Sequence, residues 1–476
     1  MAHPYRLGMH FIVSTDTQKA DPETRKLIRS QVMRGKNRIK TPRAKRQSPT
    51  SWGFMVDPAH NPHVSSDRLI EACYSFVPRR VGSDHSCAQF SDEVDPAMFG
   101  DLIQFATITM RVMFPLAAYT AFEGRDKTWF DLLSLDAAYL HITAFAAENL
   151  IGQLTGRGNH EITPEATLHL IKGVQHLRER LLLGDEEAKI SEGTVSVVLT
   201  LAIIAHSNGD YHGAKKHMEG LRKIVDLRGG LGSLRGRNFG KKLLMEMLRI
   251  DIGMAMHSGS STVFFSDASS EPYVPYPDLK VWPTRKTIEV KHSSPDETSF
   301  LDILDKDLAS AWTTMKQFCS LINLAAQSQR KLPPEVLLDT MASVMYRLLQ
   351  MTFEIGSNDQ AMRLGLLSLC HHIFLQWRDV KLPHPHFSLR FRSCLLDLKL
   401  VDSMPPHVMI WLFMIGAIST FPASENEWLK DCLRNSLAVC GIRSWDKTRV
   451  IMREFMWIDN VHDKPGKDIV DAIFVI

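Results

Sequence analysis

Residues 191–230 read SEGTVSVVLTLAIIAHSNGDYHGAKKHMEGLRKIVDLRGG, and this stretch decides the fold class. Its first half places apolar residues at the i, i+3, i+4, i+7 spacing of one helix face, and Ser191 stands where a helix N-cap is expected. The turn sequence Asn208-Gly209-Asp210 leads into a second helical pattern over 211–227, which ends at Gly229-Gly230. The stretch therefore predicts two antiparallel helices joined by a tight turn.

The helical pattern continues on both sides of this hairpin. Asp136–Leu150 predicts a deeply buried helix, and Thr163 followed by Pro164 marks the start of another. Residues 266–300 interrupt the pattern with five prolines, and helical periodicity resumes over 301–459. The sequence predicts an all-α fold in two packed helical lobes, divided as follows: a basic, partly disordered arm with one short helix (1–66), helical lobe 1 (67–265), a Pro-rich loop or linker (266–300) and helical lobe 2 (301–476).

Positive charge is concentrated at the start of the chain. Residues 1–46 hold 12 Lys or Arg and 3 acids, whereas the whole chain has a net charge of +3. A helix is expected over 22–34, with Asp21 as its N-cap and Gly35 at its end. The candidate residues for nuclear import or for phosphate contact are Arg34, Lys36, Arg38, Lys40, Arg43, Lys45 and Arg46. We place import ahead of DNA contact, because no aromatic residue for base stacking occurs between Ile12 and Thr50.

The remaining composition indicates a soluble intracellular protein. No signal-peptide pattern opens the chain, and seven scattered cysteines are typical of free thiols in a reducing compartment. The apolar run Val408–Phe421 is too short to span a bilayer and predicts a buried core helix, so no membrane partner is expected.

Tests for chemistry give no catalytic, cofactor or metal residue. No Cys-x2-Cys pair, H-E-x-x-H or G-x-S-x-G motif occurs, so no enzyme is expected, although triad residues far apart in sequence would escape this test. Three histidine groupings are interpreted as ordinary surface or core residues: His212 with His217, His371 with His372, and His384 with His386. A glycine-rich run is interpreted as a helix end and loop, with Lys241 and Lys242 as solvated charge after it: Gly229, Gly230, Gly232, Gly236 and Gly240.

Four regions of the chain resemble one family. They are FIVSTDTQKADPETRKLIRSQVMRGKNR (11–38), FPLAAYTAFEGRDKTWFDLLSLDAAYLH (114–141), NGDYHGAKKHMEGLRKIVDLRGGLGSL (208–234), and the pair MIWLFMIGAISTFPASENEWL (409–429) and GIRSWDKTRVIMREFMWID (441–459). Together they resemble the helical regulatory region of fungal-specific transcription factors, over roughly residues 11–460. The resemblance implies an all-helical domain that governs activity, dimerisation or effector response.

Family members usually join this region to an N-terminal Zn2Cys6 cluster that reads DNA. This chain departs from that pattern, because no cysteine precedes Cys73, and no DNA-contact residue can be carried over. We therefore expect a nuclear transcriptional regulator that works through an import receptor, transcription-related proteins and a homodimer or heterodimer, with weak non-specific DNA contact at most. The alternatives are a cytoplasmic location, a regulator that responds to a small metabolite, and an enzyme on a helical scaffold. Target genes and the direction of regulation are not encoded in any motif.

Overall fold

The computed structural model describes residues 90–92, 102, 105, 114–121, 128–155, 163–236, 238–267, 272–281, 302–376, 384–398, 404–421 and 427–474. All of them belong to one compact unit, Ser51–Ile476. The other unit, Met1–Thr50, lies outside the described residues, and so does the helix that the sequence predicts over 22–34. The basic arm with one short helix over 1–66 therefore stays a prediction.

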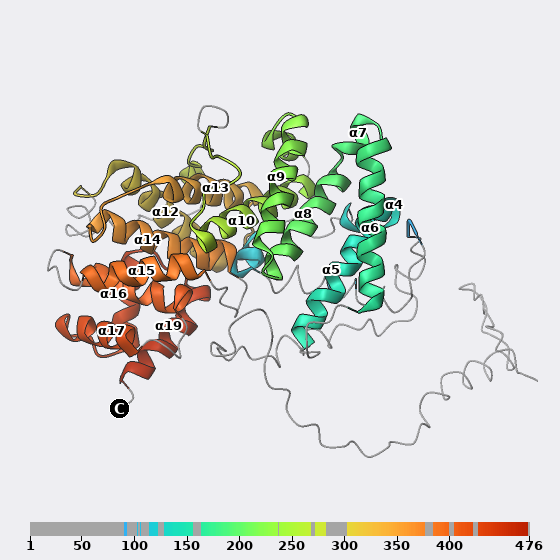
Figure 1. The fold of residues 1–476 in the computed structure, drawn as a ribbon. Coiled ribbons are helices and arrows are strands. Elements are labelled where there is room, and N and C mark those ends of the chain that lie inside the picture. The colour runs from blue at the N-terminus through green and yellow to red at the C-terminus, as the bar shows by residue number, and fades with distance from the viewer. Residues whose placement is uncertain are drawn as a thin grey trace, which may run out of the picture. The chain divides into compact units, whose positions relative to one another are not determined.

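The described part of the chain is helical, and no β-strand occurs among the described residues, which confirms the all-α fold (Figure 1). The helices before the Pro-rich stretch are α4 (Thr128–Leu135), α5 (Ala137–Thr155), α6 (Pro164–Leu183), α7 (Glu186–Lys189), α8 (Glu192–Ser207), α9 (Tyr211–Leu227) and α10 (Asn238–Ser258). Those after it are α12 (Lys306–Ser328), α13 (Pro334–Gln350), α14 (Asn358–Cys370), α15 (Pro385–Leu398), α16 (Pro406–Ile415), α17 (Glu427–Val439), α18 (Trp445–Glu454) and α19 (Asp459–Phe474).

Shorter helical segments connect or extend these helices. The 3-10 turns are η1 (Pro115–Tyr119), η2 (Leu231–Leu234) and η3 (Leu279–Val281). Two π-helical turns, η4 (His371–Leu375) and η5 (Gly416–Thr420), continue α14 and α16 and pack against each other. Within the Pro-rich stretch, the described residues 272–281 hold only η3, in agreement with the predicted loop.

The helix starts follow the local capping signals in the sequence. The Thr163 hydroxyl accepts a hydrogen bond from the backbone N–H of Ala166 at 3.1 Å, and the Ser191 hydroxyl accepts one from Thr194 at 3.2 Å. Gly209 takes a φ of +79° in the turn between α8 and α9, which pack side by side as predicted. The hairpin that decided the fold class is confirmed.

One hydrophobic core runs through helices on both sides of the Pro-rich stretch. Helix α10 packs against α8 and α9 as well as against α13 and α15, so it joins the two groups of helices (Figure 1). Trp312 of α12 and Trp411 of α16 meet edge to face at 5.1 Å and are both fully buried. The predicted boundary between two lobes at 266–300 stays a prediction.

Two apolar helices lie inside this core. Residues 186–207 are long and apolar enough to cross a membrane by length and composition, but most of the window is buried within the protein. Val195, Val197 and Ala202 of α8 have no exposed surface, as in the core helix of a globular domain. Helix α16 is buried along most of its length, which confirms the core helix predicted over 408–421.

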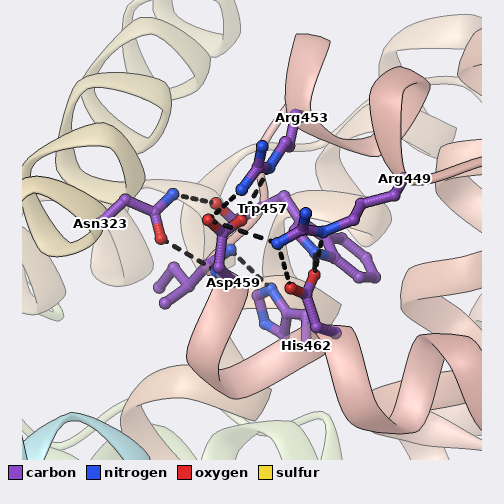
Figure 2. A network of polar contacts seen from close by, with 8 residues as sticks. Asn323, Arg449, Arg453, Trp457, Asp459 and His462 are labelled. Carbon is purple, nitrogen blue, oxygen red and sulfur yellow. Dashed lines mark hydrogen bonds and ion pairs between the residues drawn. The ribbon is translucent and has the colours of Figure 1, made fainter. Parts of the chain in front are cut away.

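A polar network fixes the last two helices to the body (Figure 2). Asn323 of α12 donates to the backbone oxygen of Trp457 at 2.7 Å, and its own side-chain oxygen accepts from the backbone N–H of Asp459 at 2.9 Å. Arg453 forms a two-pronged ion pair with Asp459, and Arg449 forms another with Asp463. Each arginine joins α18 to α19 across the loop between them, and Asn323 joins this loop to α12. The network therefore holds both helices against α12.

Candidate functional site

The basic candidate residues of the arm, Arg34 to Arg46, lie outside the described residues, so their role stays a prediction. Cysteine chemistry is not favoured in the described part of the chain. Its five cysteines are free thiols, of which four are buried and Cys440 is partly exposed. Burial raises the pKa of Cys319 to about 12 and that of Cys394 to about 11, so these thiols stay protonated at neutral pH.

The glycine-rich run ends a helix, as predicted. Gly229 and Gly230 have φ of +97° and +88°, and the N–H of Gly230 donates to the carbonyl of Val225 at 2.9 Å. The prediction that Lys241 is solvated charge was wrong. Its ammonium lies 2.5 Å from the Glu335 carboxylate and joins α10 to α13, a contact between elements far apart in sequence.

The structure brings together one histidine from each of two predicted groupings, His371 and His384. The rings of His371 and His384 meet edge to face, with 4.5 Å between the ring centres. The ring centre of His257 lies 6.3 Å from that of His384. His371 and His384 are both buried, in line with the interpretation as core residues. His212 is exposed on α9 and takes no part in this cluster.

A histidine cluster between α5 and α6 was missed at the sequence level. His141 is fully buried, with its Nδ1 atom 2.8 Å from His169 Nδ1 and its Nε2 atom 2.9 Å from an Asp92 carboxylate oxygen. The ring of His176 stacks on His141 at 6.0 Å. The missed signal was the spacing of His169, Lys172 and His176, which places these three side chains on one face of α6.

This cluster has the donor types of a zinc site. Asp92, His141 and His176 each offer a ligand atom, and these atoms lie within 4.8 Å of one another. Both nitrogens of His141 are, however, within hydrogen-bond distance of a partner, and the Lys172 ammonium is 3.5 Å from Asp92. The arrangement is therefore satisfied as a hydrogen-bonded network, in which burial lowers the pKa of His141 and of His169.

We expect a metal chelator to leave this region unchanged. Treating the purified protein with EDTA should not alter its helical circular dichroism or its thermal midpoint, because His141 already has partners for both nitrogens. A drop in the midpoint that zinc restores in the native protein, but not in His176→Gln, would contradict this expectation and assign a metal to the cluster.

One cavity lies where α10, α13, α14 and α15 converge. It has a volume of about 220 Å³, and we call it the arginine pocket because Arg363 of α14 and Arg390 of α15 both line it. Ser260, Ser261 and Thr262, which follow α10, form one wall. The apolar side is formed by Ala255, Met256, Leu349, Leu364, Leu367 and Phe387.

The charge in the arginine pocket is not balanced by an acid. Arg363 is only 6 % exposed and donates to the Leu348 carbonyl at 2.9 Å and to the Gln360 side-chain oxygen at 3.2 Å. Burial and the nearby Arg390 lower the pKa of Arg363 to about 10, so the guanidinium is still charged at neutral pH. No carboxylate lines the pocket among the described residues. The site can therefore attract an anion.

A second cavity, of about 320 Å³, lies between α9, η2 and α10. Its arginines are already engaged within the protein. Arg222 donates to the Val263 carbonyl and lies 3.7 Å from Asp226, and Arg235 pairs with Asp339 at 2.6 Å. This cavity consequently offers less unbalanced charge than the arginine pocket.

Comparison with known proteins finds one similarity, which covers part of this arrangement. Residues 104–286 match the model of the fungal-specific transcription factor domain. Two of the four regions that resemble the family, 114–141 and 208–234, fall inside this match. No curated protein and no solved structure matches the chain.

The matched residues include α8, α9, α10 and the loop with Thr262. Arg363 and Arg390 lie beyond the matched residues. The arginine pocket is thus formed jointly by the last turn of α10 and the loop after it, which lie within the matched residues, and by helices that follow the match. A ligand in the pocket would contact both.

Proposed function

We propose that this protein is a fungal transcriptional regulator that acts through its helical body and through contacts with other proteins, without a zinc-cluster module. The observation that carries the proposal is the match of residues 104–286 to the fungal-specific transcription factor domain. Contacts with transcription-related proteins, or with a second copy of the chain, are supported by exposed apolar side chains on α6: Leu168, Ile171, Val174, Leu181, Leu182 and Leu183. Catalysis is not part of the proposal.

A tethering experiment tests the regulatory role. The full chain is fused to an unrelated DNA-binding domain and brought to a reporter promoter in a fungal cell. We expect reporter transcription to change, in either direction, relative to the DNA-binding domain alone. A reporter that does not respond, although the fusion is expressed and nuclear, would contradict the proposal.

The basic arm is proposed to direct nuclear import. Replacing Lys40, Arg43, Lys45 and Arg46 together with alanine should move a fluorescent fusion from the nucleus to the cytoplasm, because an import receptor binds clustered basic side chains. The matched control replaces four exposed basic residues of the body with alanine: Arg178, Lys215, Lys216 and Lys223. Unchanged nuclear accumulation of the arm variant would rule out this role for the arm.

A second candidate function is regulation by a small metabolite. The observation that favours it is the arginine pocket, where a buried and unbalanced positive charge faces a cavity. Core packing alone does not require Arg363, because a charge removed from water without an acidic partner destabilises the folded state. Such a residue is more readily explained by a ligand that supplies the missing negative charge.

A further inference from the structure

We infer that the arginine pocket binds a small organic anion, a carboxylate or phosphate attached to a compact apolar group. The inference rests on the second candidate function and names its ligand class. It depends on three features of the pocket: two cationic side chains, a hydroxyl without a partner, and an apolar side.

The cationic side chains are placed to bind one anion together. The Nε and Nη1 atoms of Arg363 donate to Gln360 and Leu348, and these bonds hold the guanidinium in place. Its Nη2 atom forms no hydrogen bond with the described residues. Arg390 lines the same cavity from α15, and its positive charge lowers the pKa of Arg363. Two like charges that act on each other near one cavity are both stabilised when an anion lies between them. A guanidinium also matches the geometry of carboxylate and phosphate oxygens.

The unpartnered hydroxyl belongs to Thr262. This side chain is 5 % exposed, lines the pocket, and its Oγ1 atom has no hydrogen-bond partner among the described residues. A buried hydroxyl without a partner costs about 1–3 kcal/mol, so such groups are usually satisfied by protein, water or ligand. Because the Oγ1 atom has almost no accessible surface, an anion held by the two arginines would accept its hydrogen bond only after the Thr262 side chain rotates toward the cavity. Ser260 and Ser261 add further hydroxyl donors on the same wall.

The apolar side and the volume set the size of the ligand. Leu364, Leu367 and Phe387 are buried and also line the pocket. A cavity of about 150 Å³ is large enough for a benzene ring. The 220 Å³ of the arginine pocket therefore admit a ring or short branched chain that bears one anionic group. Inorganic phosphate would use the arginines but leave the apolar side empty.

A ligand in the arginine pocket would also connect two groups of helices. Thr262 follows α10 in the matched domain, whereas Arg363 and Arg390 belong to α14 and α15. An anion that contacts all three residues would hold the matched domain against the helices that follow it. Such a ligand would stabilise one arrangement of the two groups of helices over others, as an effector does.

Binding is tested on the full-length protein with four probes: benzoate, phenyl phosphate, inorganic phosphate and benzamide. Thermal midpoints and isothermal titration give the response. We expect benzoate or phenyl phosphate, or both, to raise the midpoint and to bind at least tenfold more tightly than neutral benzamide. Which of the two binds more tightly distinguishes a carboxylate from a phosphate ligand. Inorganic phosphate should bind more weakly than phenyl phosphate.

Two variants and a matched control locate the site. Arg390→Gln should weaken binding of the preferred probe at least tenfold, and Arg363→Lys should do the same because a lysine keeps the charge but loses the planar fork. Arg392→Gln is the control, because Arg392 lies on the same helix but stacks over Trp428, at 5.4 Å from the ring centre. It should bind the probe as the native protein does.

Three outcomes would overturn the inference. They are no binding of either organic anion, equal binding of benzamide, and equal weakening by Arg390→Gln and Arg392→Gln. Because Arg390 is exposed, its replacement should leave the fold intact even if Arg363→Lys does not fold. The tethered reporter reports on regulation and the titration on binding alone, so failure of the pocket and failure of the regulatory role can be told apart.

Discussion

Replacing Asp251 with alanine is expected to lower the free energy of unfolding by about 3–5 kcal/mol. Asp251 lies on α10, is 1 % exposed, and its carboxylate accepts three hydrogen bonds from the described residues. The donors are the backbone N–H of Val263 at 2.6 Å, the backbone N–H of Phe264 at 2.9 Å and the hydroxyl of Tyr346 at 2.8 Å. Alanine accepts none of them, so buried donors on two different elements lose their partner.

The position of these donors makes the loss of unfolding free energy larger than the contribution of a single hydrogen bond. Val263 and Phe264 belong to the loop after α10, and Phe265 next to them has a φ of +54°, which is unfavourable for an aromatic residue. Asp251 holds this loop against α10 and, through Tyr346, against α13. The same loop carries Thr262 of the arginine pocket, so Asp251→Ala should also weaken binding of the preferred anion.

Urea unfolding followed by circular dichroism measures the effect. Tyr346→Phe removes one of the three bonds and should cost only about 1 kcal/mol. Asp468→Ala is the matched control: Asp468 is exposed on α19, and its replacement should stay within about 0.5 kcal/mol of the native protein. If Asp251→Ala behaved like Asp468→Ala, the loop would not depend on this carboxylate.

The parts of the fold that the sequence predicts are those decided by neighbouring residues. Thr163 and Ser191 cap the helices that follow them, and the Asn208-Gly209-Asp210 turn reverses the chain, because each signal acts within four residues of its partner. Helical periodicity likewise identifies α8 as a helix. It does not identify which residues are buried, because α8 is buried on most of its sides and Val197, Leu201 and Ile204 lie off the predicted face. The two helix caps, the turn and the helical pattern follow from local chemistry, and the structure confirms them.

The pocket residues could not be predicted in this way. Thr262, Arg363 and Arg390 come from three separate elements, and only packing brings them to one cavity. The buried guanidinium of Arg363 looks like an ordinary surface charge in the sequence, because no motif shows that α14 is buried on every side. Lys241 was misjudged for the same reason: its partner Glu335 lies on α13.

Acid is expected to destabilise the protein strongly between pH 6.5 and pH 4, through buried histidines at the junction of α8, α10 and α15. His384 is buried, lies 4.5 Å from His371 and 6.3 Å from His257, and its ring nitrogens have no hydrogen-bond partner among the described residues. Burial, together with His371, His206 and His257, lowers the pKa of His384 well below its usual value. Burial and His257 lower the pKa of His206 to about 4. The groups that act on His384 are therefore all histidines, and none is an acid.

The lowered pKa values of these histidines determine how stability changes with pH. A histidine with a pKa near 6.5 in the unfolded chain and a lower pKa in the folded protein takes up its proton more readily when unfolded. Its contribution to stability is complete above pH 6.5 and is lost as the pH falls toward the folded pKa. For His206 the full loss amounts to about 3 kcal/mol, taken over the drop from 6.5 to about 4. His384, being more deeply buried and surrounded by histidines, adds to this loss.

A substitution separates this cluster from the general effect of acid on the carboxylates. His384→Leu removes the titrating ring and places an apolar side chain among buried neighbours. The difference in unfolding free energy between pH 7.5 and pH 4.5 should therefore be smaller in this variant than in the native protein. His212→Gln, at an exposed position of α9 outside the cluster, is the matched control. A His384→Leu variant that loses as much stability in acid as the native protein would show that the ring binds its proton equally well in the folded and the unfolded protein, and this result would contradict the buried cluster as the cause.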